Sequence, residues 1–349
     1  MDSKFEKWGE LPTEMRMECV KWMSFKSRMR LRGASKSDKS LVESAPKYHF
    51  DRVTIIFGNF QLTSAEFKKA GAEADNFKLE GSRNPKVREN AENLAVQLLK
   101  FASADNFKYI RENAEDMRFL EKIGYLESYK FKNVELISDT LVFMKMFAEK
   151  CENPEKMVIK KTSESERDEP LDQLIDIPAI HNAKILQLVV CAYSYPYKYV
   201  NSLIEKWGHR DAEQGTTLQL AVNDRYHLSK LSNNLKDRII YKKANEIRLR
   251  AGNESKHILM RQDKMSDESV YISLVVIPAD QKESEYEKND QWAEELHEQQ
   301  TKARQRRIMQ TVSSLLGGLN VQNIQGMFAD LAAPEGHDPA EDNNLEDYY

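Results

Sequence analysis

The middle of the chain contains four short β-prone runs at nearly constant spacing. They begin near residues 131, 157, 184 and 216, so that successive starts lie 26, 27 and 32 residues apart. Apolar faces of helical period lie between some of them, over residues 141–151 and 197–207. Strands that alternate with helices predict an α/β arrangement rather than a helical bundle.

The period of these units leaves two architectures open. Units of one strand and one helix at this spacing approach leucine-rich repeats, in which side-by-side strands form a curved sheet. The runs lack a repeated Asn or Cys ladder position, so an ordinary irregular α/β domain remains an equal alternative. We therefore expect an α+β or α/β fold class, with irregular leucine-rich-repeat-like strand–helix units in an α/β domain over residues 51–280.

The flanking segments complete this expected domain. Residues 53–57 alternate as on a strand, whereas the charged, Gly-containing residues 66–85 predict a loop or weakly ordered insertion. Apolar residues at helical spacing predict two helices, over residues 87–98 and 110–120. Further strands, as an antiparallel edge that Pro278 ends, are expected over residues 246–250, 257–261 and 271–277.

Residues 8–46 predict a compact block of three short helices. After Pro12, which suits the first position of a helix, Met15, Cys19, Val20 and Met23 recur at three- and four-residue spacing on one face. This pattern is typical of an amphipathic helix with a single apolar face.

Local capping signals predict the other two helices of the block. Ser24 or Ser27 can cap the second helix, and Gly33 is expected to end it because glycine accepts positive φ. Ser35 with Asp38 resembles a capping box that opens the third helix.

The sequence of the block is similar to an F-box, in the form common in the large nematode F-box family. Residues 8–46 read WGELPTEMRMECVKWMSFKSRMRLRGASKSDKSLVESAP. The positions that match the family's Leu-Pro-x-Glu opening and its Leu-Arg-x-x-Ser-Lys stretch are Leu11, Pro12, Glu14, Leu31, Arg32, Ser35 and Lys36. Residues 51–280 are similar in style to the C-terminal domains of that family, often called FTH, which are thought to present substrate.

Three positions depart from the broader F-box pattern. Cys19 stands where Ile or Leu is usual, Arg28 where Leu is usual, and Asp38 where an aromatic residue is often found. Arg28 and Asp38 resemble the nematode variant. Cys19 is smaller than the usual residue, although a free cysteine still behaves as a small hydrophobe.

The resemblance implies a non-catalytic substrate adaptor of a ubiquitin ligase. Its partners would be a Skp-type adaptor, through it a cullin, and a protein substrate marked for ubiquitin-dependent degradation. The expected adaptor-binding residues are Leu11, Pro12, Met15, Cys19, Val20, Met23 and Leu31. The alternative is a structural or scaffold protein whose degenerate F-box engages no ligase.

Signals of catalysis or of a bound metal are poor. The seven histidines form no HExxH or HxH pair, and the only paired glycines in an apolar setting, Gly317 and Gly318, lack the Lys-Ser/Thr of a phosphate loop. We therefore expect no catalytic, cofactor-binding or metal-binding residues and no cofactor. The basic cluster Lys302, Arg304, Arg306 and Arg307 follows a Glu-rich stretch, so nucleic-acid binding is not expected.

Charge and cysteine usage favour a cytoplasmic or nuclear protein. The formal net charge of −4 gives no global attraction to nucleic acid or to an anionic membrane. Three widely spaced cysteines do not form a disulfide framework, and no apolar run approaches the roughly 20 residues that span a bilayer. A charged helix with an apolar stripe is expected over residues 281–333, and a disordered acidic tail over residues 334–349.

Overall fold

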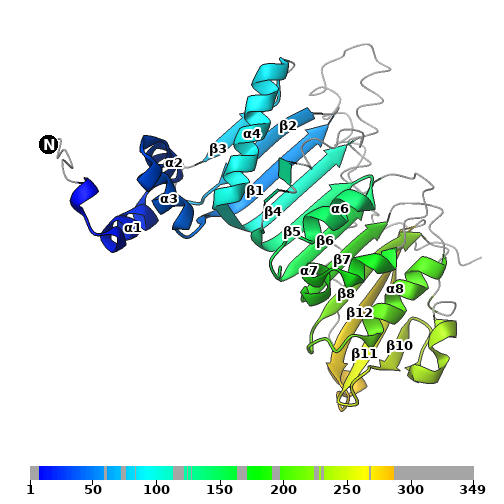
Figure 1. The fold of residues 1–349 in the computed structure, drawn as a ribbon. Coiled ribbons are helices and arrows are strands. Elements are labelled where there is room, and N and C mark those ends of the chain that lie inside the picture. The colour runs from blue at the N-terminus through cyan, green and yellow to red at the C-terminus, as the bar shows by residue number, and fades with distance from the viewer. Residues whose placement is uncertain are drawn as a thin grey trace, which may run out of the picture. The chain divides into compact units, whose positions relative to one another are not determined.

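The computed structural model describes residues 8–58, 61–71, 76–82, 84–112, 122–123, 125–126, 128–162, 171–190, 197–223, 228, 232–266 and 269–286. Every described residue belongs to one compact unit, residues 1–286. Within that unit, a small block of helices precedes a mixed sheet of twelve strands (Figure 1). This architecture confirms the expected fold class, a small helical block followed by an α/β domain.

The helical block folds as its capping residues predict, with one exception. Its elements are η1 (Trp8–Glu10), α1 (Thr13–Trp22), α2 (Phe25–Ala34) and α3 (Lys36–Ser44). Ser24 caps α2, and Ser35 caps α3 by accepting from the Asp38 amide. The expectation that Gly33 ends α2 was wrong, because the helix continues to Ala34 and the extended backbone of Ser35, with φ of −154°, ends it.

The core of the block is formed by three buried side chains. Val20 from α1 packs with Leu41 and Val42 from α3. Pro12 precedes α1 as its cap residue rather than occupying the first helical position. A core this small leaves most of the block's apolar side chains only partly buried.

The sheet has six parallel strands in its middle and antiparallel strands at both ends. The order is β3-β2-β1-β4-β5-β6-β7-β8-β12-β11-β10-β9, with β1 and β4 to β8 mutually parallel. The strands are β1 (Tyr48–Gly58), β2 (Gln61–Lys68), β3 (Phe77–Glu80), β4 (Ala102–Glu112), β5 (Lys130–Ser138), β6 (Lys156–Lys161), β7 (Ile185–Val190), β8 (Thr217–Asn223), β9 (Ile239–Lys242), β10 (Glu246–Arg250), β11 (Lys256–Ser266) and β12 (Ser269–Pro278). The four regularly spaced runs are β5 to β8, as predicted.

Two expectations for the first part of the sheet were wrong. Ile110 lies in strand β4 rather than at the start of a helix, and residues 113–121 lie outside the described residues. The segment 66–85 contributes the end of β2 and all of β3 rather than a loop. The alternating Lys and Glu residues of β2 and β3 belong to an edge hairpin, which buries only one of its faces.

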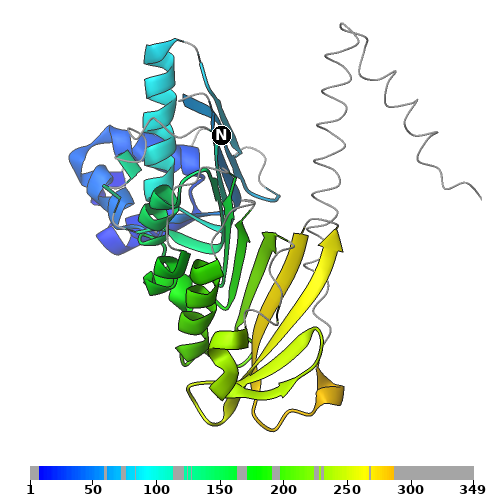
Figure 2. The same cartoon turned by 90° about the vertical axis from the view of Figure 1, so that its right-hand side faces the viewer.

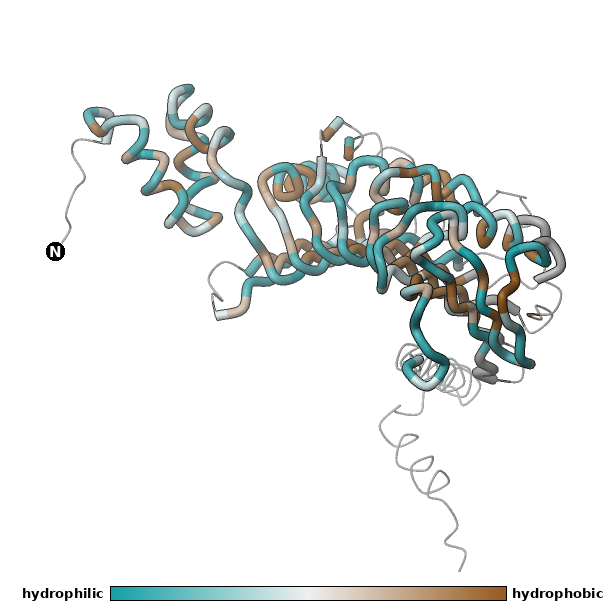
Figure 3. The backbone as a smooth tube through the Cα atoms, turned by 90° about the horizontal axis from the view of Figure 1, so that it is seen from below, coloured by the Kyte–Doolittle hydropathy of each residue, from teal (hydrophilic) through white to brown (hydrophobic). Residues whose placement is uncertain are grey.

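Five helices of the sheet domain lie together on one face of the sheet (Figures 1 and 2). They are α4 (Pro85–Phe101), α6 (Leu141–Ala148), η3 (Leu171–Asp176), α7 (Pro178–Asn182) and α8 (Tyr197–His209). Stacked rings join this layer to the strands: Phe107 of β4 lies 4.4 Å from Phe131 of β5 and 4.8 Å from Phe147 of α6, between ring centroids. Figure 3, seen from below, shows the same one-sided arrangement.

The opposite face of the sheet, which we call the second face, is polar over the first parallel strands. One cross-strand row on it runs from Arg52 through Asn106 and Asn133 to Lys156. Asn133 donates from Nδ2 to Asn106 Oδ1 at 3.1 Å. Two neighbouring strands thus do share an Asn position, which the sequence comparison of the runs had missed because β4 was not assigned as a strand.

Candidate functional site

The outward face of α1 carries the most exposed apolar side chains of the helical block. Met15 is 55% exposed and Trp22 is 84% exposed. Pro12 is also exposed, and Cys19 is half-buried on the same side of the helix. The spacing of three, four and three residues places these four residues on one helical stripe, which we call the α1 face.

The seven predicted adaptor-binding residues divide between this face and the interior of the block. Pro12, Met15 and Cys19 belong to the α1 face, and Leu11 is half-buried just before it. Val20 is 0% exposed and forms the core of the block. The remaining two, which are half-buried and pack against that core, are Met23 and Leu31.

Trp22 was missed when the sequence was read alone. The prediction placed Met15, Cys19, Val20 and Met23 on one apolar face and left Trp22 out, because an apolar stripe marks burial without saying what covers it. The available signal was the position of Trp22 seven residues after Met15, which places both on one side of α1.

Asp38, one of the three departures from the F-box pattern, is a buried hydrogen-bond acceptor that ties η1 to α3. Trp8 donates from Nε1 to Asp38 Oδ1 at 2.9 Å, and the Ser35 hydroxyl donates to Asp38 Oδ2 at 2.7 Å. These two hydrogen bonds hold the pKa of Asp38 below its usual value, and the one from Trp8 has the larger effect. The carboxylate therefore accepts hydrogen bonds at a position where an aromatic ring would contribute apolar packing.

Arg28, the second departure, is buried and joins three parts of the chain. It donates from Nη2 to the Lys21 carbonyl at 2.9 Å, and from Nη1 to the Pro46 carbonyl at 2.8 Å. Its guanidinium also lies 5.2 Å from the centre of the Tyr48 ring. Burial lowers the pKa of Arg28. The side chain thus satisfies carbonyls at the end of α1 and before β1.

Phe25 packs the helical block against the first strands of the sheet. Its ring lies 5.6 Å from Tyr48, 5.7 Å from Phe50 and 5.4 Å from Phe77, between centroids. The side chain is buried within the main core rather than in the small core of the block. The F-box-like helices and β1 to β3 therefore share apolar packing.

The second face of the sheet is hollowed where β1, β4, β5 and β6 lie side by side. The hollow has a volume of about 460 Å³. Its polar lining consists of Arg52, Thr54, Asn106, Lys108, Asn133, Glu135 and Lys156. Three of these are cations and one is an anion.

Glu135 is already paired within this hollow. Its two carboxylate oxygens lie 2.8 Å from Lys108 Nζ and 2.7 Å from Lys160 Nζ. Burial acts to raise the pKa of Glu135, but the two lysines outweigh it and the pKa lies below its usual value. Arg52 and Lys156 have no carboxylate partner among the residues that the structure describes.

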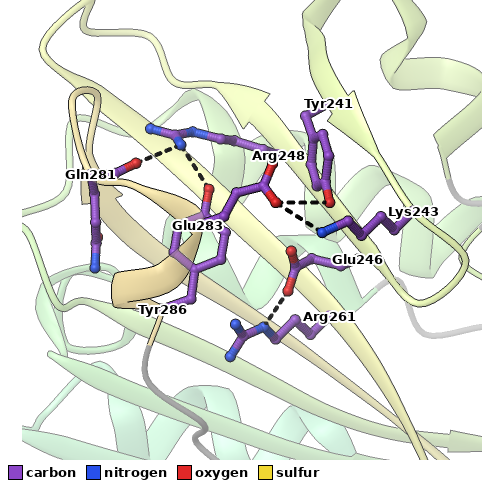
Figure 4. Close-up of polar contacts among 8 residues, drawn as sticks. All are labelled: Tyr241, Lys243, Glu246, Arg248, Arg261, Gln281, Glu283 and Tyr286. Atoms are coloured by element: carbon purple, nitrogen blue, oxygen red, sulfur yellow. Dashed lines mark hydrogen bonds and ion pairs between the residues drawn. The ribbon is translucent and has the colours of Figure 1, made fainter.

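At the antiparallel end, part of the second face is covered by the segment after β12. Arg248 of β10 is buried, and Figure 4 shows Tyr286 and Gln281 beside it. Its five hydrogen bonds go to His257 Nδ1 at 2.8 Å, Pro278 O at 3.3 Å, Ala279 O at 2.7 Å, Gln281 O at 2.7 Å and Tyr286 Oη at 2.7 Å. Lys243 pairs with Glu283 at 2.8 Å, so the short helix η5 (Glu283–Glu285) is held as well.

Within the part of the chain that the structure describes, groups that could bind a metal or act as a nucleophile are scarce. No set of three or more His, Cys, Asp or Glu residues within the described ranges is arranged to hold a metal ion. The Cys151 thiol is buried, and burial raises its pKa, which opposes formation of a reactive thiolate. Among the described helices, none has the length and apolar character needed to cross a membrane.

Comparison with known proteins identifies one domain. Residues 8–50 match the F-box domain. F-box domains typically bind a Skp-type adaptor in complexes with a cullin, and the proteins that carry them are generally non-catalytic adaptor subunits of ubiquitin ligases. No curated protein matches the chain.

One similar solved structure is an S-adenosylmethionine-dependent methyltransferase from Clostridium acetobutylicum ATCC 824. It is 10% identical over 48% of this chain and 63% of that chain, with a TM-score of 0.14. A score this low carries no argument about the fold or the function of this protein.

Proposed function

From the F-box domain at residues 8–50, we propose that the chain is a substrate adaptor of a Skp–cullin–F-box ubiquitin ligase and binds the Skp-type adaptor through the α1 face. The observation that carries this proposal is the exposure of Met15 and Trp22 on one stripe of α1. The chain would itself catalyse no reaction. It would act by holding a protein substrate beside the ligase.

The α1 face has the chemistry of an interface core. Burying a large apolar side chain is worth roughly 1.5–3 kcal/mol, and tryptophan is among the residues that most often dominate binding energy. Trp22 at 84% exposure retains nearly all of its surface for a partner. An amphipathic helix that lays such a face into a groove is a recurring mode of protein recognition.

The buried residues of the predicted set support this face from behind. Val20 packs with Leu41 and Val42, and Met23 and Leu31 pack against that cluster. Their truncation would loosen the three helices rather than remove a contact with the partner. We assign them a positioning role in the proposed interface.

We further propose that the sheet domain recognises the protein substrate and that the chain belongs to the nematode-type F-box family with an FTH-like C-terminal domain. The second face supports the role in substrate recognition, because it presents exposed or half-buried polar side chains over several strands. The free Cys19 and Cys151 are consistent with work in the cytoplasm or nucleus, where thiols stay reduced.

Cys19 favours the second candidate, a scaffold protein whose degenerate F-box binds no ligase. It lies on the α1 face between Met15 and Trp22, where a larger aliphatic side chain is usual. Its smaller side chain gives less apolar surface to a partner.

Co-purification of the full chain with a Skp-type adaptor tests both candidates. The test variant is Met15→Ser/Trp22→Ser, and the matched control is Val87→Ser/Leu94→Ser, which changes two exposed apolar residues on α4. We expect the test variant to weaken binding about thirtyfold or more, as for loss of a hot-spot residue, and the control to bind as wild type does. Lack of binding by the wild-type chain would favour the scaffold, and unchanged binding by the test variant would place the interface elsewhere.

A further inference from the structure

We propose that the hollow on the second face of the sheet binds an extended acidic segment of a partner protein, with Arg52 and Lys156 each holding one carboxylate. This inference rests on the proposed role of the sheet domain in substrate recognition and names the chemistry of the substrate. It is carried by the order of side chains along one row of the sheet.

Two asparagines separate the two cations along the row. Arg52 pairs with Asn106 across β1 and β4, Asn106 with Asn133 across β4 and β5, and Asn133 with Lys156 across β5 and β6. Side chains at paired positions of adjacent strands point to the same face. Three strand spacings separate the two cations, which is about 14 Å.

The charges in and beside the hollow favour an anionic ligand. Lys108 and Lys160 share Glu135, and those three groups carry one net positive charge between them. Arg52 and Lys156 add two positive charges that meet no carboxylate within the described part of the chain. A cleft lined mainly by one sign of charge attracts ligands of the opposite sign.

The amides between the two cations suit a peptide backbone. Asn106 donates from Nδ2 to the Asp51 carbonyl at 3.1 Å, and Asn133 donates from Nδ2 to Asn106 Oδ1 at 3.1 Å. This chain of amides fixes the orientation of both side chains. It leaves Asn133 Oδ1 without a donor among the described residues, and this oxygen can accept a hydrogen bond from a peptide N–H.

The spacing of the cations predicts the spacing of the acidic residues. An extended chain rises about 3.3 Å per residue, so two carboxylates about 14 Å apart are separated by about four residues. The segment would cross the strands along the row rather than add a strand to the sheet edge. Arg52 can hold a carboxylate with two parallel hydrogen bonds, whereas Lys156 acts as a point charge.

The same features argue against nucleic acid as the ligand. Proteins that bind single strands combine basic grooves with exposed aromatic rings on which bases stack. Phe107, the one aromatic residue among those that line the hollow, is buried and stacks on Phe131 and Phe147. The distance of about 14 Å between the two cations also does not match the much closer spacing of phosphates along a nucleic-acid strand.

Fluorescence anisotropy with the full chain and labelled peptides tests the proposal. The probe is a peptide of otherwise neutral residues with two Glu residues at positions i and i+4, and the comparison peptides carry two Gln at those positions or two adjacent Glu. We expect the i, i+4 Glu peptide to bind about fivefold to tenfold more tightly than either comparison, as two partly exposed ion pairs allow. Its affinity should fall as salt is raised.

A charge-matched pair of variants locates the site. Arg52→Gln/Lys156→Gln should lose the preference for the Glu peptide. Lys206→Gln/Lys243→Gln removes the same charge from α8 and from the residue that follows β9, where Lys206 pairs with Asp176 and Lys243 pairs with Glu283, and should keep it. Equal binding of the Glu and Gln peptides to wild type, equal losses in the two variants, or tighter binding of a single-stranded oligonucleotide would overturn the proposal.

The adaptor experiment keeps this inference separate from the proposed function. Arg52→Gln/Lys156→Gln should still co-purify with the Skp-type adaptor, and Met15→Ser/Trp22→Ser should still bind the Glu peptide. Adaptor binding without peptide selectivity would refute the acidic ligand and leave the ligase role standing. Peptide selectivity without adaptor binding would refute the ligase role and leave the acidic ligand standing.

Discussion

Arg52 and Arg248 stand in the same cross-strand row of the second face, near opposite ends of the sheet. The row continues from Lys156 through Ile185, Thr217, Val275 and Leu259 to Arg248. Arg248 is buried under residues 279–286 and makes five hydrogen bonds, whereas Arg52 is exposed and meets no carboxylate within the described residues.

This difference shows how one face of a sheet can have two uses. At the antiparallel end, the chain satisfies the polar groups of the second face with its own following segment. At the parallel end, Arg52 and Lys156 meet no carboxylate among the described residues. A cation that its own fold has paired contributes to stability, whereas an unpaired one is available for recognition.

The largest expected effect contrasts the two arginines directly. Arg248→Met leaves four of its five acceptors without a donor among the described residues, because only the Pro278 carbonyl also accepts from another group, the Gln281 amide. It should lower the free energy of unfolding by about 2–4 kcal/mol. Arg52→Met should change it by less than about 0.5 kcal/mol, because an exposed side chain is removed. Urea unfolding of both variants measures the difference, and similar losses for the two arginines would break the comparison.

Glu135→Gln gives a smaller effect and tests whether the parallel end also contains a stabilising pair. We expect a loss of about 1 kcal/mol at neutral pH, since Gln cannot replace the charge between Lys108 and Lys160. The pKa of Glu135 lies below its usual value because the lysines outweigh burial. Its contribution is therefore complete above the unfolded-state pKa and is lost as pH falls through the folded-state pKa.

Urea unfolding at about pH 7 and about pH 3 measures this contribution. The difference in stability between wild type and Glu135→Gln should shrink at the lower pH. A difference that is the same at both pH values would show that packing of the side chain, rather than its charge, accounts for the loss.

The smallest effect concerns His257, which accepts a hydrogen bond from Arg248 Nε at Nδ1. Burial, with Arg248 and Arg250 nearby, lowers the pKa of His257 from its ordinary 6.5. The native state therefore binds fewer protons than the unfolded state, and stability from this group is present above about pH 6.5 and lost as pH falls. His257→Gln should flatten the pH dependence of the unfolding midpoint between about pH 7 and about pH 5, and an unchanged slope would contradict the assignment.

Local signals were sufficient to predict the helical block and β5 to β8. Ser24 and Ser35 act within three residues of the amides that they cap, so their effect depends on sequence neighbours alone. The strands β5 to β8 are short apolar runs separated by helices. This alternation can be recognised in the sequence without knowing which strands pair.

The remaining parts depend on partners that are distant in the sequence. The sequence predicts a helix from Ile110, at the end of β4, because Ile110 begins an apolar pattern that fits a helical period. The row from Arg52 to Lys156 could not be predicted, since it requires the register of four strands. Trp22 was overlooked because its exposure depends on how α1 packs against α3.

The exposure of Trp22 also gives the chain an intrinsic optical probe. Trp22 is 84% exposed, whereas Trp207 of α8 is 1% exposed in the core. A water-exposed indole emits at longer wavelength and is readily quenched, so covering Trp22 would shift its emission toward the blue while the emission of Trp207 stays constant. Since Trp8 and Trp292 also emit, the part of the blue shift that Trp22→Phe removes reports occupation of the α1 face.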